Sequence, residues 1–325
     1  MTKLPVIMCI DVEPDDREIA PFERSDWKGF EHAYSFFRQL RPRLESATGA
    51  NVRFSWFLRM DPQIEHTYGS PSWVVSRYPE IIDQLQSDGD ELGLHIHSWR
   101  WDSIKRRWVA DHANQSWVEQ CVRTSFAAFQ RALGRPCQSF RFGDRWMNNE
   151  TMSLVEQLGA KFDLSLEPGH KETRRMNPRE LSTGSLPDSR GVPLRPFRPS
   201  RTNFREPDPV GGFDVNVIPV STARPGLPSV KRVLNIKMMA KYQLARFKGP
   251  SQLNPCINAA EFQQIVDAII HERGDGYLAP VMRVDGFSKP KQRSNVERNF
   301  QQLISHPLID RFRFVTPAAA VKLLS

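Results

Sequence analysis

Residues 5–16 read PVIMCIDVEPDD, an apolar run that ends in a group of acidic side chains. The almost continuous apolar character of Pro5–Val12 is typical of a β-strand that is buried on both faces of a parallel sheet. Side chains alternate along an extended backbone, so Asp11 and Glu13 are expected on the same side of this strand, with Asp15 as a candidate third carboxylate. The stretch therefore predicts a buried strand that presents acidic side chains at its carboxyl end.

Strand and helix patterns alternate through the rest of the chain. Short apolar runs predict further strands at residues 52–58, 91–97, 139–142, 161–165, 213–219, 277–284 and 312–315. Apolar residues at helical spacing predict helices at residues 27–40, 72–85, 114–133, 150–158, 258–272, 295–304 and 317–324. Repeated strand–helix units indicate a mainly parallel sheet, and this many units can close into a barrel.

Two segments depart from this alternation. Residues 187–228 contain nine prolines and few periodic apolar residues, which predicts an irregular insertion. Its basic stretch, residues 195–205, is interpreted as a solvated loop, and binding of an anionic group by its arginines is the alternative. Residues 230–247 form a basic amphipathic pattern, interpreted as an outer helix packed on the sheet, with a helix lying on an anionic membrane surface as the alternative. We therefore predict an α/β fold in which residues 1–325 form a single elaborated barrel domain.

Composition excludes several classes of protein. The chain has 325 residues with 39% hydrophobic and 25% charged side chains, which is ordinary globular composition. No apolar window is long enough for a transmembrane helix, and the first residues lack a signal-peptide pattern. The four cysteines are scattered without a paired motif, so a reduced, cytoplasmic protein is expected.

The net charge of +8 raises nucleic acid as a partner, but the basic residues are spread along the chain. The sequence contains no zinc-finger spacing and no glycine-rich phosphate-binding motif, so we expect no nucleic-acid partner. The pattern indicates no particular oligomeric state.

Polar side chains gather at the predicted carboxyl ends of the strands, where parallel α/β folds carry their active sites. In ELGLHIH (residues 91–97), His95 and His97 are two residues apart and should face the same way. Two imidazoles and a carboxylate suit a divalent metal such as zinc, and a second carboxylate could take a proton from a bound water. Each signal alone has a plainer alternative: ordinary histidines, an acidic loop start, or a structural ion pair at Arg141.

Tryptophans also lie near the predicted strand ends, at positions 56, 99, 101 and 146. Flat amphipathic rings are suited to docking sugars, and they are equally suited to filling the mouth of a barrel. Both interpretations stay open from the sequence.

Three motifs together carry a family resemblance. DVEPD (residues 11–15), ELGLHIH (residues 91–97) and FRFGDRW (residues 140–146) resemble the polysaccharide deacetylases, the nodulation-protein homology domain of carbohydrate esterase family 4. The resemblance covers about residues 5–170 and is closest to atypical members whose first motif is D-V-E rather than D-D-G. It implies an irregular seven-stranded (β/α) barrel and a metal-dependent hydrolase.

The resemblance also implies roles for individual residues. Asp11 would be the catalytic base, Glu13 and His95 metal ligands, Arg141 the residue that holds the base, and Asp163 the aspartate of the fourth motif. The chain departs from the family pattern at three places. Glu13 replaces the usual aspartate. Trp99 stands where the second metal histidine is expected, so either His97 serves instead or the metal site is incomplete.

The third departure concerns the last motif, where the family has a general-acid histidine. Here Arg283 or Asp285 is near the expected place. An arginine cannot donate a proton at neutral pH, although it can stabilise an oxyanion. His170 is a weaker candidate for the missing imidazole.

The sequence therefore predicts a hydrolase that uses a divalent metal, Zn²⁺ with Co²⁺ or Ni²⁺ as alternatives, to remove an N-acyl group, acetyl above all, from an amino sugar or glycan. The alternatives are a deacetylase-like barrel that binds carbohydrate without hydrolysing it, and a hydrolase of a non-sugar amide. Predicted substrate contacts are Trp56, Arg59, Asp61, Trp99, Asp144, Arg145, Trp146 and His170.

Overall fold

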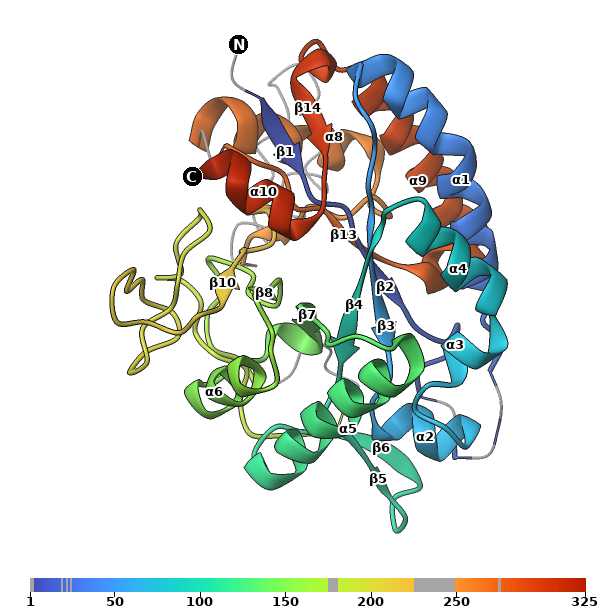
Figure 1. Ribbon diagram of the computed structural model, residues 1–325, viewed down its shortest axis with the longest axis vertical. Helices are drawn as coiled ribbons and strands as arrows, with labels where there is room; N and C mark the ends of the chain where they lie inside the picture. Colours follow the sequence, from blue (N-terminus) through green and yellow to red (C-terminus); the bar gives the residue numbers. More distant parts are fainter. Residues whose placement is uncertain are drawn as a thin grey trace, which may run out of the picture.

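The computed structural model describes residues 3–18, 20–21, 23, 25–174, 181–224, 249–273 and 276–325. Within these residues, seven strands form one curled parallel sheet at the centre of the molecule (Figure 1). In spatial order they are β10 (Asn216–Val217), β8 (Phe162–Asp163), β7 (Ser139–Phe142), β4 (Glu91–Ile96), β3 (Ser55–Arg59), β2 (Cys9–Val12) and β13 (Val281–Arg283). The predicted α/β fold class, an irregular (β/α) barrel, is confirmed.

Helices follow most strands and pack outside the sheet. They are α1 (Lys28–Thr48), α2 (Pro62–Tyr68), α3 (Trp73–Arg77), α4 (Pro79–Ser87), α5 (Gln115–Leu133), α6 (Asn149–Gln157), α8 (Ala259–Asp267), α9 (Pro290–Ile304) and α10 (Pro317–Leu324). In Figure 1, α1, α4 and α9 lie along one flank of the sheet. Several begin at side chains that accept a backbone N–H, as Asn114 does for α5.

Two predicted helices have different bounds in the structure. The helix predicted at 27–40 continues through Pro42 to Thr48, because Leu40 and Leu44 extend its buried face. The helix predicted at 72–85 is divided into α3 and α4 at Tyr78, since a residue before proline disfavours helical dihedrals. The helix predicted at 230–247 lies outside the described residues.

Smaller sheets complete the fold. The predicted strand 5–12 is divided into β2 and β1 (Leu4–Val6), which pairs with β14 (Phe312–Phe314). The hairpin β5 (Trp99–Asp102) and β6 (Arg107–Asp111), together with β9 (Leu181–Thr183), forms a sheet that the sequence did not predict. The same is true of the pair β11 (Thr222–Ala223) and β12 (Ser251–Gln252). No helix in the described part of the chain has the length and apolar character needed to span a membrane.

The two faces of the central sheet bury different sets of side chains. Ile10 and Trp56 belong to the large apolar cluster that includes residues of the surrounding helices. Cys9 and Phe57 belong to a smaller apolar cluster, with Tyr277 and other residues inside the curl of the sheet. The alternation places every second residue of each strand toward the interior, and at the carboxyl ends these inward positions become polar.

Candidate active site

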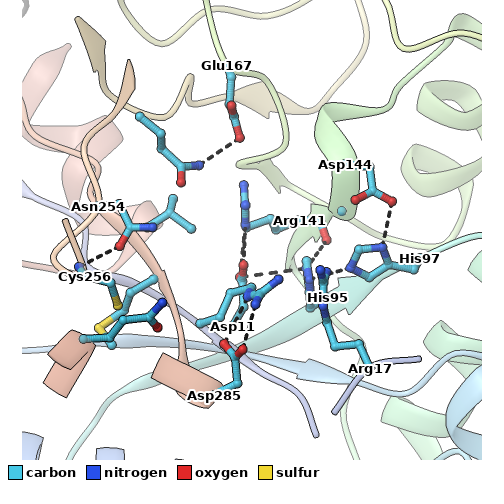
Figure 2. A pocket seen from close by; sticks show the side chains of 16 residues that line it. Asp11, Arg17, His95, His97, Arg141, Asp144, Glu167, Asn254, Cys256 and Asp285 are labelled. Carbon is cyan, nitrogen blue, oxygen red and sulfur yellow. Dashed lines mark hydrogen bonds and ion pairs between the residues drawn. The ribbon is translucent and has the colours of Figure 1, made fainter. Parts of the chain in front are cut away.

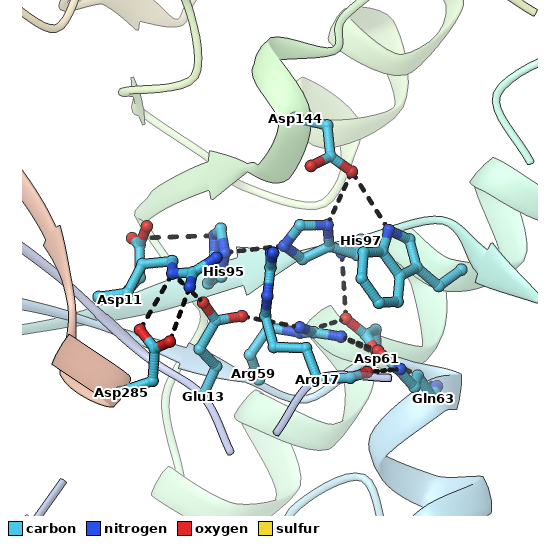
Figure 3. Close-up of polar contacts among 12 residues, drawn as sticks. Asp11, Glu13, Arg17, Arg59, Asp61, Gln63, His95, His97, Asp144 and Asp285 are labelled. Carbon is cyan, nitrogen blue, oxygen red and sulfur yellow. Dashed lines mark hydrogen bonds and ion pairs between the residues drawn. The ribbon is translucent and has the colours of Figure 1, made fainter. Parts of the chain in front are cut away.

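Inward positions of four neighbouring strands bring the polar side chains together. The strand register pairs His95 of β4 with Arg59 of β3 on one side and with Arg141 of β7 on the other, while Asp11 lies on the next strand, β2. All four side chains are at least nine-tenths buried. Side chains two residues apart in a strand share a face, and on these neighbouring strands the inward faces bring the polar side chains of the motifs into one cluster (Figure 3).

His95, in β4, and His97, directly after β4, direct their Nε2 atoms at each other, 3.0 Å apart. His95 Nδ1 lies 3.2 Å from the carbonyl oxygen of Arg141, and His97 Nδ1 lies 3.0 Å from Oδ2 of Asp144. A carbonyl and a carboxylate only accept hydrogen bonds, so each Nδ1 carries the ring proton and each Nε2 keeps its lone pair. Second contacts of this kind hold the tautomer of histidines that bind metals.

Electrostatics support neutral imidazole at His95 and an ionised carboxylate at Asp144. Burial lowers the pKa of His95 well below its usual range, and His97, Arg141 and Arg59 act in the same direction. Burial opposes ionisation of Asp144, but its interaction and hydrogen bond with His97 outweigh burial, with His112 and Arg17 acting in the same direction, and the pKa of Asp144 lies well below the usual range. Two lone pairs facing each other at this distance repel unless a cation lies between them.

Glu13 supplies a third donor to the same space. Its Oε2 accepts a hydrogen bond of 3.1 Å from Arg59 Nη1. Its Oε1 is 3.1 Å from Arg283 Nε without the geometry of a hydrogen bond, so it is a buried oxygen with no hydrogen-bond partner among the described residues. One ligand atom each from Glu13, His95 and His97 lies within 4.8 Å of the others. Two imidazoles and a carboxylate form a zinc donor set, so these residues fit a divalent cation.

Asp15, the fourth predicted ligand, lies elsewhere. Its Oδ1 accepts a 3.0 Å hydrogen bond from the backbone N–H of Gly29 in the first turn of α1. An acidic side chain at this place satisfies a free helix N–H, and Asp15 is not part of the group formed by Glu13, His95 and His97.

Arg59 and Asp61, predicted to contact substrate, are fully buried, which corrects that prediction. Arg59 donates to Asp61 through Nε and Nη2, at 2.7 and 3.2 Å, as well as to Glu13. Asp61 Oδ2 in turn accepts the backbone N–H of His97 at 3.0 Å. Arg59 and Asp61 therefore hold the Glu13 carboxylate and the backbone of His97 in place, and neither lines the pocket.

Asp11 and Arg141 form a buried ion pair next to this cluster. Arg141 Nε lies 3.0 and 3.1 Å from the two carboxylate oxygens, and its Nη1 donates to the carbonyl oxygen of Leu164. Burial raises the pKa of Asp11, and Arg141 opposes that rise. Asp11 Oδ1 is 3.8 Å from His95 Nδ1, which places the carboxylate beside the candidate ligands.

A pocket of about 280 Å³ opens over these groups (Figure 2). Asp11, both histidines, Arg141, Asp144, Arg283 and Asp285 line it. Several lining residues escaped the sequence analysis because they come from distant segments and carry no motif: Arg17, Glu167, Gln252, Asn254, Cys256 and Gln292. The pocket wall is therefore strongly polar, with three guanidinium groups and four carboxylates.

The predicted tryptophan contacts are corrected by burial. Trp56 is completely buried in the large apolar cluster and donates from Nε1 to Asp90. Trp99 and Trp146 are 3% exposed; Trp99 donates to Asp144, and Trp146 stacks on His112. None of the three presents an open ring face to a sugar: Trp56 packs between the sheet and α1, and Trp99 and Trp146 are buried against Asp144 and His112.

The remaining predicted residues lie around the pocket in different ways. Asp144 and Arg145 follow β7 with left-handed dihedrals, φ 57° and 59°, which non-glycine residues adopt only under local constraint. Asp163 is fully buried, accepts from Ser165, and is not among the residues that line the pocket. His170 does not line it either; its Nε2 is 3.6 Å from Oε2 of Glu167, which does.

Comparison with known proteins gives a fold and no family. No protein-family model and no curated protein sequence matches the chain. A Parabacteroides distasonis structure described as a glycoside hydrolase/deacetylase matches 99% of this chain and 71% of its own, with 13% identity and a TM-score of 0.57. The PuuE allantoinase structure matches 99% and 90%, with 12% identity and a TM-score of 0.52. At these identities the likeness shows a shared fold.

Proposed function

We propose that the protein is a metal-dependent amide hydrolase that removes an N-acyl group, acetyl above all, from an amino sugar or glycan. The observation that carries the proposal is the convergence of three metal-type donors, of which the two histidines line one polar pocket, beside a buried Asp11–Arg141 pair that lines the same pocket. Glu13, His95 and His97 would hold the cation, for which we propose Zn²⁺, with Co²⁺ or Ni²⁺ as substitutes. When bound, such a cation polarises the acyl carbonyl and acidifies a water.

Asp11 is suited to take the proton of the attacking water. Both of its oxygens contact Arg141 Nε, so the carboxylate is held in one orientation on the pocket floor. Arg141 is itself fixed through Nη1 to a backbone carbonyl, which makes it a positioning residue. A base held in place in this way contributes typically 10²–10⁴-fold to a hydrolytic step.

Arg283 is suited to receive negative charge on the acyl oxygen. Its Nε and Nη2 donate to Asp285, at 3.1 and 2.7 Å. Its Nη1 makes no hydrogen bond to the described residues, and Arg283 lines the pocket. Donors already in place where charge develops stabilise it without reorganisation.

The polar pocket wall supports a hydroxyl-rich substrate, and the shared fold with a protein described as a glycoside hydrolase/deacetylase agrees with it. A second candidate, hydrolysis of a small non-sugar amide, is favoured by the absence of an open tryptophan face at Trp56, Trp99 and Trp146. The allantoinase of the same fold is consistent with that candidate.

The test combines metal content with acetate release. Purified wild type should hold about one divalent ion per chain, His95→Ala/His97→Ala should hold none, and Asp11→Asn should keep the ion and lose turnover. His271→Ala is the matched control, because His271 belongs to a second His/Asp group, with Asp267 and His306. There, His306 Nδ1 accepts a backbone N–H, so the proton sits on Nε2 and the site is unsuited to a metal.

Acetate release is measured on N-acetylated amino sugars and, for the second candidate, on small non-sugar amides. Metal binding that survives His95→Ala/His97→Ala would contradict the ligand assignment. A wild type that binds sugar but holds no metal after supplementation with Zn²⁺, Co²⁺ or Ni²⁺ would instead favour a carbohydrate-binding protein.

A further inference from the structure

Hydrolysis of an amide needs a proton donor for the departing nitrogen, and the pocket offers few. An arginine cannot donate at neutral pH. His95 and His97 are both placed as ligands. Burial raises the pKa of the Cys256 thiol to about 12, too high for an efficient general acid. The candidates that remain are the carboxyl groups of the pocket wall.

Four carboxyl groups line the pocket, and three are committed to strong donors. Asp11 is paired with Arg141, and Asp144 accepts from His97 and Trp99. Asp285 is held at 2.7 Å by Arg283 and at 2.6 Å by Lys289. Each of these partners stabilises the ionised form, which has no proton to give.

Glu167 is different. Its Oε1 accepts a hydrogen bond of 2.8 Å from the neutral amide of Gln252. Its Oε2 has no hydrogen bond to the described residues: Arg145 Nε is 4.0 Å away and His170 Nε2 is 3.6 Å away. The residue is only 5% exposed, yet it lines the pocket. In Figure 2 it reaches toward Arg141 from the side opposite Asp11.

We propose that Glu167 is the general acid, giving the proton on Oε2 to the departing amine nitrogen. This inference rests on the proposed amide hydrolysis. Asp11 takes one proton from water as the C–O bond forms, and Glu167 gives one proton to nitrogen as the C–N bond breaks. The protein's proton count is unchanged, and both groups return to their starting states by exchange with solvent. No oxidant, reductant or co-substrate other than water is needed.

The surroundings of Glu167 agree with a carboxyl group that keeps its proton. Burial raises its pKa above the usual range. The charged and titratable groups that face it are Arg145, Arg141, Asp11, Asp144 and His170, of which the two arginines lower the pKa and the two aspartates raise it. Among the described residues no cation donates a hydrogen bond that fixes the ionised form, in contrast to Asp11 and Asp285.

The experiment compares two probes with the same acyl and aryl groups in the metal-loaded full chain. In 4-nitroacetanilide the leaving nitrogen must be protonated, whereas the nitrophenolate of 4-nitrophenyl acetate leaves without a proton. For Glu167→Gln we expect a loss of at least about 100-fold in kcat/KM on the anilide, with ester cleavage within about threefold of wild type. Glu167→Asp should retain part of the anilide activity, because it keeps the proton and shortens the reach.

The matched control is Glu91→Gln. Glu91 is a half-buried carboxyl group whose pKa is also raised by burial, but it lies at the amino end of β4, away from the pocket, where it accepts a hydrogen bond from Ser139. This variant should cleave both probes like wild type, and both Gln variants should keep the metal. Equal losses on the two probes in Glu167→Gln, or no loss on either, would overturn the assignment. A wild type that binds metal but releases acetate neither from these probes nor from N-acetylated amino sugars would instead refute the proposed function, and the assignment with it.

Discussion

The contact between Asp144 and His97 gives a sharp test of the site, through the substitution Asp144→Asn. Asparagine has the same shape, and it tolerates the left-handed dihedrals of this position, where φ is 57°. Its oxygen can take the place of Oδ2 and keep the hydrogen bonds from His97 Nδ1 and Trp99 Nε1, now at 3.0 and 3.2 Å. The substitution therefore removes the negative charge and little else.

The expected loss of metal affinity follows from the effect of the Asp144 charge on the His97 imidazole. A carboxylate behind a metal-binding imidazole fixes the tautomer and raises the basicity of Nε2, and its loss typically costs 10–100-fold in metal affinity. That range corresponds to about 1.4–2.7 kcal/mol of binding free energy. Charge-assisted hydrogen bonds are about twice as strong as neutral ones, which is consistent with this size.

The assay is competition for Zn²⁺ against a chromophoric chelator, at one pH and one ionic strength. Asp26→Asn is the control, because Asp26 is 67% exposed and pairs with Lys28 on the surface. We expect Asp144→Asn to bind Zn²⁺ 10–100-fold more weakly and Asp26→Asn to bind it like wild type. Affinities that agree within twofold for all three proteins would refute the assignment of His97 as a ligand supported by Asp144.

Three further substitutions test the interior. Arg59→Met should lower the free energy of unfolding by about 3–5 kcal/mol in urea titrations, because Arg59 is completely buried and leaves two carboxylates uncompensated; a loss below 1 kcal/mol would contradict this. Burial raises the pKa of Asp163 from 3.8 to about 6, so wild-type stability should fall as pH rises through that window. Asp163→Asn should lack this fall and be more stable than wild type at pH 8, by on the order of 3 kcal/mol, with no gain below pH 4. Free energies of unfolding that change with pH in parallel for the two proteins would contradict the raised pKa of Asp163. Gly143→Ala would place a Cβ 2.1 Å from His97 Cε1 and should abolish Zn²⁺ binding while the fold is retained by circular dichroism; wild-type affinity would show that the imidazole can move.

The part of the fold that the sequence could predict is the part set by local periodicity. Alternation along Cys9–Val12 and Glu91–Ile96 predicted one shared face for each motif, and the structure has Asp11 and His95 on inward positions. The hairpin of β5 and β6 was missed because its turn, residues 103–106, lacks the glycine or asparagine that marks tight hairpins; Arg106 supplies the positive φ instead.

The part of the site that escaped prediction depends on tertiary neighbours. Arg59 has the same sequence context as a pocket residue, but Asp61 and Glu13 on either side of it hold it below the pocket floor. No sequence motif marks Glu167, because its hydrogen-bond partner Gln252 lies 85 residues away in the chain.

The alternation of inward and outward side chains has a consequence for engineering and evolution. Chemistry and packing are encoded on separate positions of the same strands, so a library that varies only the inward positions at the carboxyl edge can search for new reactions without touching the residues that hold the helices. A one-residue deletion in β4 has the opposite effect, because it turns both imidazoles toward the helix layer and Leu94 and Ile96 toward the pocket. The alternation of inward and outward positions along each strand must therefore be kept, whereas the identities of the inward residues at its carboxyl end can change.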